Sequence, residues 1–148
     1  MNQDFHPILW PTISLAGLVF TVWFVLMRAR LRHVASHRPT RADFADGESV
    51  ARYFRPVERP AQNLANLFEM PVLYFALVPI LLQTGSATLL QVTLAWVFVA
   101  LRLLHSLVHI GPNTIRTRFR IYLASCIALA AMWLGFLADL AIRFGGKI

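Results

Sequence analysis

The sequence predicts an all-α integral membrane protein, a bundle of four membrane-spanning helices. Of its 148 residues, 57% are hydrophobic and only 14% are charged, which leaves too few polar residues to cover a soluble domain of this size. The hydrophobic residues gather in four runs, each near the ~20 residues that cross the hydrocarbon core: Ile8 to Met27, Leu64 to Leu82, Leu89 to Leu104 and Phe119 to Phe136. The runs do not alternate between polar and apolar residues, as barrel strands would.

We expect one domain over residues 1–148, with helices at about 8–28, 60–83, 87–110 and 117–142. Gly85-Ser86 and the run Gly111 to Asn113 suit the two short turns. The segment 29–59 has a different composition, because Pro39, Asp46-Gly47 and Pro56 interrupt it. It is therefore expected to be one loop between the first two spans, partly ordered.

The distribution of arginines predicts the orientation in the membrane. Eight lie between the first two runs and three more open the fourth run: Arg28, Arg30, Arg32, Arg38, Arg41, Arg52, Arg55 and Arg59, then Arg116, Arg118 and Arg120. The opposite side has only Arg143 and Lys147, near the C-terminus. The positive-inside rule therefore places loop 29–59 and the last turn in the cytoplasm and both termini outside. The net charge of +7 favours anionic lipid headgroups over nucleic acid as partner, because the arginines flank membrane spans.

Two helices carry polar residues inside their apolar runs, where such residues need partners or a wet cavity. The second helix has Gln62, Asn66 and Glu69 on one face, and the third has Arg102, His105 and His109 at equivalent spacing. In an antiparallel hairpin that turns at Gly85-Ser86, the two stripes lie level, with Glu69 opposite Arg102, Asn66 opposite His105 and Gln62 opposite His109.

The polar stripes allow three interpretations. The first is a structural ion pair between Glu69 and Arg102 that fixes the helix register. The second is a metal or haem site at His105 and His109, which are four residues apart, but no third ligand shares their face. The third, which we favour, is a ligand site.

The fourth helix adds Arg118, which shares a face with Tyr122 and Ser125. Arg116 and Arg120 point roughly the other way and suit lipid phosphates at the interface. A permanently charged arginine on the cavity side can hold a carboxylate or keep a thiol ionised. Arg116 is the competing candidate for this role.

The chain resembles the MAPEG family, the membrane-associated proteins in eicosanoid and glutathione metabolism, over nearly its whole length. The resemblance rests on Asn66-Leu67-Phe68-Glu69-Met70-Pro71, on Arg102-Leu103-Leu104-His105 with His109 four residues on, and on the arginine cluster followed by Tyr122. It implies a homotrimer of four-helix subunits that binds glutathione between neighbouring subunits near the cytoplasmic face.

Carried over to this chain, the resemblance implies that Asn66 and Glu69 bind the glutathione backbone and that Arg102 supports Glu69. His105, His109 and Tyr122 would line the pocket, and Arg118 would stabilise the thiolate. Gln62 and Ala65 stand near where several glutathione-using members have an arginine, and Arg59 is the candidate substitute. The expected function is a glutathione-dependent transferase or peroxidase acting on lipophilic electrophiles. The alternative is a non-catalytic ligand-binding scaffold of the same fold.

Overall fold

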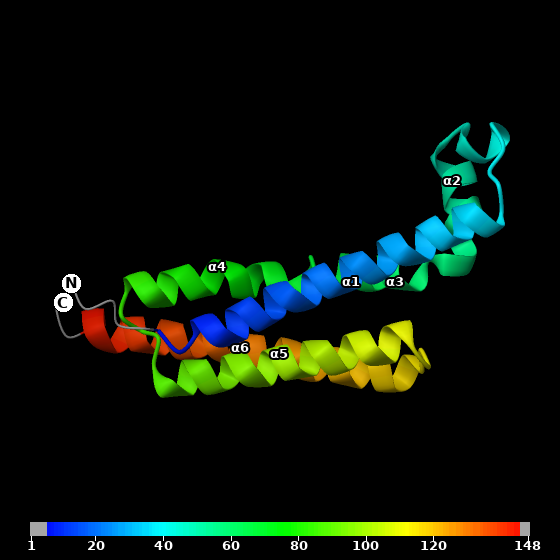
Figure 1. The fold of residues 1–148 in the computed structure, drawn as a ribbon. Coiled ribbons are helices and arrows are strands. Elements are labelled where there is room, and N and C mark those ends of the chain that lie inside the picture. The colour runs from blue at the N-terminus through cyan, green and yellow to red at the C-terminus, as the bar shows by residue number, and fades with distance from the viewer. Residues whose placement is uncertain (1–5, 146–148) are drawn as a thin grey trace.

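The computed structural model describes residues 6–145, with side chains as far as Arg143, and it is all-helical within that range. The helices follow in the order α1 (Leu9–Ser36), η1 (Ala42–Phe44), α2 (Gly47–Phe54), η2 (Arg55–Val57), α3 (Arg59–Asn66), α4 (Met70–Gln83), α5 (Leu89–Ile110) and α6 (Ile115–Gly145). Four segments are long and apolar enough to span a membrane: Leu9–Ser36, Arg59–Gln83, Leu89–Ile110 and Ile115–Arg143. They run side by side as an elongated bundle (Figure 1). The prediction of an all-α, multi-pass membrane protein is confirmed.

The first helix continues well beyond the span expected from its hydrophobic residues. We expected it to end near Arg28, but α1 runs to Ser36 and ends three residues before Pro39. Arginine, alanine and leucine are all good helix formers, so the helix continues where the hydrophobic run stops. We call this end of the bundle, where segment 28–59 and the α5–α6 turn lie, the arginine-rich end.

The second span is two helices rather than one. α3 ends at Asn66 and α4 begins at Met70, so residues 67–69 interrupt the helix. Pro71 explains the break, because proline has no N–H for the carbonyl of Leu67 and its ring clashes with that carbonyl. Pro79 is accommodated within α4, so proline alone does not dictate a break.

The third and fourth spans form an antiparallel hairpin. Thr88 caps α5, its hydroxyl accepting a hydrogen bond from the Gln91 N–H. At the other end the turn closes through Asn113, whose φ of 52° is left-handed and whose N–H donates to the carbonyl of Val108 at 2.7 Å. Asparagine is one of the few side chains that tolerate this conformation.

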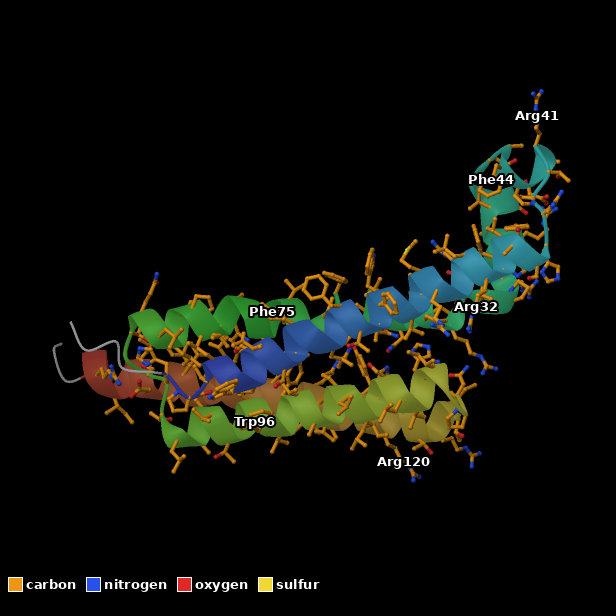
Figure 2. The ribbon with its side chains drawn as sticks, viewed as in Figure 1. Arg32, Arg41, Phe44, Phe75, Trp96 and Arg120 are labelled. Atoms are coloured by element: carbon orange, nitrogen blue, oxygen red, sulfur yellow. The ribbon has the colours of Figure 1, made fainter. Side chains whose placement is uncertain are left out.

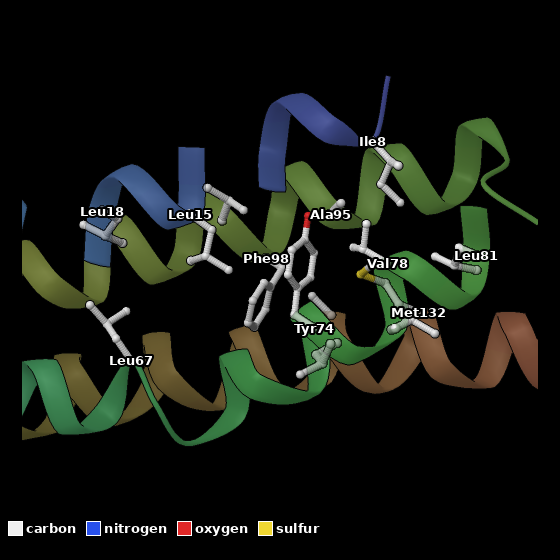
Figure 3. Packing of buried hydrophobic residues seen from close by; sticks show 14 of the residues in the cluster. Ile8, Leu15, Leu18, Leu67, Tyr74, Val78, Leu81, Ala95, Phe98 and Met132 are labelled. Atoms are coloured by element: carbon white, nitrogen blue, oxygen red, sulfur yellow. The ribbon is translucent and has the colours of Figure 1, made fainter. Parts of the chain in front are cut away.

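Most of the hydrophobic core, part of which Figure 3 shows, lies toward the end of the bundle opposite the arginine-rich end. Tyr74 of α4 stacks on Phe98 of α5 with ring centroids 5.2 Å apart, and the Tyr74 hydroxyl shares a hydrogen bond with Thr12 of α1. Large apolar side chains also cover the outside, and Phe20, for example, is 71% exposed. Such a surface needs lipid around it, which fits an integral membrane protein.

The chain from His37 to Glu58 folds into a small lobe beyond the end of α5 and α6. In Figure 1 α2 turns away from the long axis of the bundle. His33, Phe44, Tyr53 and Phe54 pack their rings together here, with the His33 and Tyr53 centroids 4.8 Å apart. The segment expected to be a partly ordered loop is therefore built of short helices.

At the opposite end Arg143 of α6 donates hydrogen bonds to the carbonyls of Thr84 and Gly85 and pairs with Asp139. The turn expected at Gly85-Ser86 is thereby tied to α6. Lys147 lies outside the described residues.

Candidate functional site

A cavity of about 210 Å³ lies near the arginine-rich end, where α3, α5 and α6 meet. Its walls come from the last residue of α3, the last turns of α5 and the first turns of α6. The lining residues are Asn66, His105, Ile115, Arg118, Phe119 and Tyr122. The structure thus brings together four of the residues singled out from the sequence.

Arg102 lies fully buried beside this cavity, with its guanidinium carbon 5.5 Å from the centre of the Tyr122 ring. Its Nη2 donates to the backbone carbonyl of Asn66, the last residue of α3. The carbonyls at a helix C-terminus have no intrahelical partners and carry the negative end of the helix dipole. The break after Asn66 therefore supplies a partner for a buried cation. The other guanidinium atoms of Arg102, Nε and Nη1, have no hydrogen-bond partner.

The expected ion pair between Glu69 and Arg102 does not form. The ion pairs of the described side chains are Arg30–Glu58, Arg52–Glu48 and Arg143–Asp139. Glu69 instead lies exposed just before α4, and its Oε2 accepts a hydrogen bond from the Tyr122 hydroxyl at 3.5 Å. The interrupted helix is the reason, because residues 67–69 no longer continue the face that Asn66 occupies.

Both histidines are buried and leave one ring nitrogen without a partner. His105 Nδ1 lies 3.3 Å from the backbone carbonyl of Arg118, and His109 Nδ1 lies 3.5 Å from Asn66 Nδ2. The Nε2 atoms of both rings are buried without partners. Within residues 6–145 no group of three metal-ligating side chains comes together, so the two histidines remain a pair of polar ring edges.

Of the three arginines that open α6, Arg118 alone lines the cavity. It is half-buried, and its Nη1 donates to Asn113 Oδ1 at 2.8 Å across the α5–α6 turn. Arg116 and Arg120 are exposed, and Figure 2 shows Arg120 pointing away from the bundle. The shared face of Arg118 and Tyr122 therefore exists in the fold.

Three other residues expected at the site lie at its margin. Ser125 is fully buried, and its hydroxyl donates to the carbonyl of Tyr122 at 2.7 Å, so it supports that turn of α6 and does not line the cavity. Gln62 is exposed and outside the lining. Arg59 is also exposed, and its Nη1 donates to the carbonyl of Gly111 at 3.1 Å.

Sequence reasoning missed Asn63, which takes the inward position expected for Gln62. It is fully buried, and its Oδ1 accepts a hydrogen bond from Ser106 Oγ of α5 at 3.3 Å. Asn63 and Ser106 are both polar residues in apolar surroundings at similar depth, so the sequence held a signal for this pair. The apolar wall residues Ile115 and Phe119 could not be singled out, because their neighbours are equally apolar.

The site combines permanent positive charge, spare N–H donors and an apolar wall. Arg102 supplies two unused N–H groups, and Arg118 supplies a second guanidinium at the cavity. Buried donors without partners are costly unless a ligand or water completes them. Such a site suits an anionic ligand that lies next to an apolar molecule, which it contacts or with which it reacts.

Residues 8–138 match the model of the MAPEG family. The chain belongs to the MAPEG family. This places it among the membrane proteins of glutathione and eicosanoid metabolism. Neither the curated proteins nor the solved structures gave a match.

Proposed function

We propose that this MAPEG protein is a glutathione-dependent transferase or peroxidase that acts on lipophilic electrophiles. The observation that carries the proposal is the fully buried Arg102, with two unpartnered N–H groups beside a cavity that Arg118 and Tyr122 line. A buried cation with spare donors is costly to keep without a function, and such groups gather at ligand sites.

The residues present fit glutathione. The tripeptide carries two carboxylates and several amide groups, so it needs mainly donors and positive charge for its ends. Arg102 offers Nε and Nη1 as donors, and His109, whose Nδ1 faces the Asn66 amide, offers its Nε2–H. His105 donates through Nδ1 to the Arg118 carbonyl, so its Nε2 offers an acceptor. Asn66 at the cavity and Glu69 at its margin can pair with the amide and amino groups. Arg102 is held by the α3 terminus, so Glu69 remains available to the ligand.

Arg118 is the residue that we assign to the thiol. A permanent positive charge close to the sulfur favours the thiolate, and the proton leaves to solvent. In the transferase reaction the thiolate attacks an electrophilic carbon, a C–S bond forms, and the leaving group departs with the electron pair of its bond to carbon. In the peroxidase reaction the thiolate attacks a hydroperoxide oxygen, giving a sulfenic acid and an alcohol. A second glutathione then yields the disulfide and water.

The electrophile would enter from the lipid past the apolar wall of the cavity. Ile115 and Phe119 line the cavity and also face outward, with Ile115 70% exposed. A substrate dissolved in the bilayer can therefore reach the sulfur without crossing water. This is the basis for expecting a lipophilic substrate class.

We also propose that the protein is a homotrimer in which a neighbouring subunit completes the site. Glu69 is exposed next to Phe68, which is 61% exposed, on a surface made largely of apolar side chains. An acidic side chain inside the bilayer costs roughly 2.5 to 3.5 kcal/mol on insertion scales, so a protein partner is the better neighbour. Native mass spectrometry in mild detergent tests this, and a purely monomeric protein would contradict it.

The arginine-rich end is proposed to face the cytoplasm, following the positive-inside rule. The lobe that carries Arg38, Arg41, Arg52 and Arg55 would then be cytoplasmic. In a Cys126→Ser background, a cysteine introduced at Arg41 should react with an impermeant thiol reagent only after the inner face is opened. Labelling from outside would reverse the orientation.

The test of the catalytic role is a comparison of Arg118→Ala with Arg116→Ala and Arg120→Ala. Arg118→Ala should abolish the thiolate absorbance of bound glutathione and slow conjugation of a chloronitrobenzene about a hundredfold, the scale of one lost electrostatic stabiliser. The two control variants remove the same charge from exposed positions and should leave both signals unchanged. Equal activity in all three variants, or a loss only with Arg116→Ala, would overturn the assignment.

A ligand-binding scaffold without turnover is the second candidate. It is favoured by Gln62 and Ala65, both exposed, which leave no cation on that part of α3 to hold the ligand. Spectral titration of glutathione for a thiolate band separates the two functions, because a scaffold binds its ligand without forming the thiolate and without conjugation.

A further inference from the structure

A second hollow region lies between α1 and α5 and shares no lining residue with the cavity at α6. It consists of two adjoining hollows of about 360 and 280 Å³, which have Leu18 and Leu103 in common. Together they form one groove along residues 14–25 of α1 and residues 96–110 of α5 with Gly111 directly after it, which we call the α1–α5 groove. It plays no part in the function proposed above.

The α1–α5 groove presents almost only carbon to a ligand. Leu18, Val22 and Val99 are buried and form its floor, while the exposed Leu103 and Leu107 form its rim. The one buried polar group in the floor is Ser106, whose hydroxyl is already committed to Asn63 Oδ1. The floor therefore offers an occupant no hydrogen bond, and a polar ligand would gain little there.

The length of the groove matches one acyl chain of one leaflet. At 1.5 Å per residue, residues 14–25 cover about 16 Å of α1 and residues 96–111 cover about 22 Å of α5. The hydrocarbon core is about 30 Å thick, so the chains of one leaflet reach about 15 Å inward. Both helices belong to membrane spans, so the groove opens to lipid.

Arginines stand where the groove reaches the arginine-rich end. Val25 lines the groove, and Arg28 and Arg32 continue the same face of α1 at three and then four residues further on. Figure 2 shows Arg32 on the part of α1 that extends past the ends of α5 and α6. From the other side, Arg59 donates a hydrogen bond to the carbonyl of Gly111, the groove residue that directly follows α5.

Nothing acidic neutralises this group of arginines. Glu58 pairs with Arg30 at 3.8 Å, and among the described side chains neither Arg28 nor Arg32 has an ion pair. No acidic residue lines either hollow. An apolar groove of one-leaflet length, with a cluster of cations at its interfacial end, is complementary to an anionic lipid.

We propose that the α1–α5 groove binds an anionic phospholipid, with one acyl chain in the groove and the phosphate held by Arg28, Arg32 and Arg59. A zwitterionic lipid can fill the same groove, but it gains less from the arginines because its own cation competes. The bound lipid is a specific ligand of each subunit, separate from the glutathione site.

Native mass spectrometry of the purified oligomer, with added dioleoyl phosphatidylglycerol or dioleoyl phosphatidylcholine, tests the headgroup preference. The wild-type protein should retain phosphatidylglycerol in preference to phosphatidylcholine. Arg28→Gln with Arg32→Gln should weaken phosphatidylglycerol retention about twenty-fivefold, from about fivefold for each arginine. The control is Arg38→Gln with Arg41→Gln, which removes the same charge from the lobe and should leave retention unchanged. Equal retention of the two lipids, or equal loss in both double variants, would overturn the headgroup assignment.

Filling the groove tests the acyl-chain position. Thr21→Trp and Ala100→Trp each place a bulky ring in one of the two hollows, and both should abolish retention of either lipid. Ala76→Trp, at an exposed position on α4 outside the groove, is the matched control and should bind lipid as the wild type does. Thermal unfolding verifies that all three variants are folded. Wild-type lipid retention in both groove variants would overturn the proposal. Variants that lose the oligomer but keep the lipid would also overturn it, because a second copy of the chain would then occupy the groove.

Discussion

The lobe between α1 and α3 and the cavity at α6 are both rich in polar side chains, but they satisfy them in different ways. In the lobe, the partners are close in sequence: Asp46 accepts from the N–H of Ser49 at 2.7 Å, and Asp43 accepts from the N–H of Thr40 at 2.8 Å. At the cavity the partners come from other helices, and polar atoms of Arg102, His105 and His109 are left without partners.

This difference indicates which polar groups stabilise the fold and which are available to bind a ligand. A solvent-exposed polar group that forms its hydrogen bonds within its own turn stabilises that turn and needs no further partner. A buried donor without a partner is a standing cost that a bound molecule can remove. Substitutions at the two places should therefore have opposite consequences for binding and for stability.

The largest expected effect is at Arg102. Arg102→Met removes the two unpartnered donors but fills the same space with an apolar side chain. Two charge-assisted hydrogen bonds at roughly 1.5 kcal/mol each correspond to about a hundredfold loss of glutathione affinity by calorimetry. The unfolding temperature should change little, because removing a buried charge with two unpartnered donors offsets the loss of the hydrogen bond to the Asn66 carbonyl.

Arg102→Lys is the matched control for charge. Lysine keeps the charge but loses the planar fork of donors, so its affinity should lie between those of Arg102→Met and the wild type. An Arg102→Met protein that is strongly destabilised but still binds glutathione would contradict this prediction. Arg102 would then stabilise the fold and would not bind the ligand.

A smaller effect is expected at Asn63 and Ser106, the buried pair whose hydrogen bond links α3 to α5. Asn63→Ala leaves the Ser106 hydroxyl without its partner and should destabilise the protein by about 1 to 3 kcal/mol. Asn63→Ala with Ser106→Ala should cost less than the sum of the two single changes. Thermal unfolding in detergent measures all three variants, and additive losses would show that the pair is not coupled.

The smallest effect is expected in the lobe, at the N-cap of α2. The hydrogen bond from the Ser49 N–H is the main reason that the pKa of Asp46 lies below its ordinary value of 3.8. A hydrogen bond from the Ser49 hydroxyl lowers this pKa further. A carboxyl whose pKa falls on folding stabilises the folded form fully above the unfolded pKa, and it loses that contribution as the pH falls through the folded pKa.

Hydrogen exchange is the suitable measurement for the lobe. Asp46→Ala should reduce amide protection in α2 at neutral pH, and Asp46→Asn should keep most of it, since asparagine is an equally good N-cap. Wild-type protection in α2 should fall only below about pH 4. Glutathione affinity should not change in either variant. A change in affinity would mean that the lobe and the cavity are coupled.

The four spans could be predicted because their cause is local: lipid selects long apolar runs, and composition records them. The end of α1 could not be predicted in the same way. Hydropathy indicates where the hydrocarbon stops, whereas the helix continues through Arg28 and Arg32 to Ser36 because these residues favour helix in water as well.

The candidate site was predicted as a set of residues but not in its pairing. The predicted alignment of α3 along α5 was close to that in the structure, since Asn66 contacts both Arg102 and His109. The partner of Arg102 was missed because it is a backbone carbonyl, which every residue has and no sequence pattern marks. Pro71 was the available signal for the break that exposes this carbonyl, but Pro79 in the same helix shows why one proline was insufficient evidence.

The break before α4 also affects the membrane around the protein. α4 runs from Met70 to Gln83, about 20 Å at 1.5 Å per residue, whereas the hydrocarbon is about 30 Å thick. The remaining depth on this flank is crossed by a segment that holds Asn66 and Glu69. The hydrophobic thickness of this span therefore depends on α3 and residues 67–69 together with α4. A neighbouring subunit that covers this flank keeps Glu69 away from the hydrocarbon, whereas on an uncovered flank the bilayer would have to thin around its carboxylate.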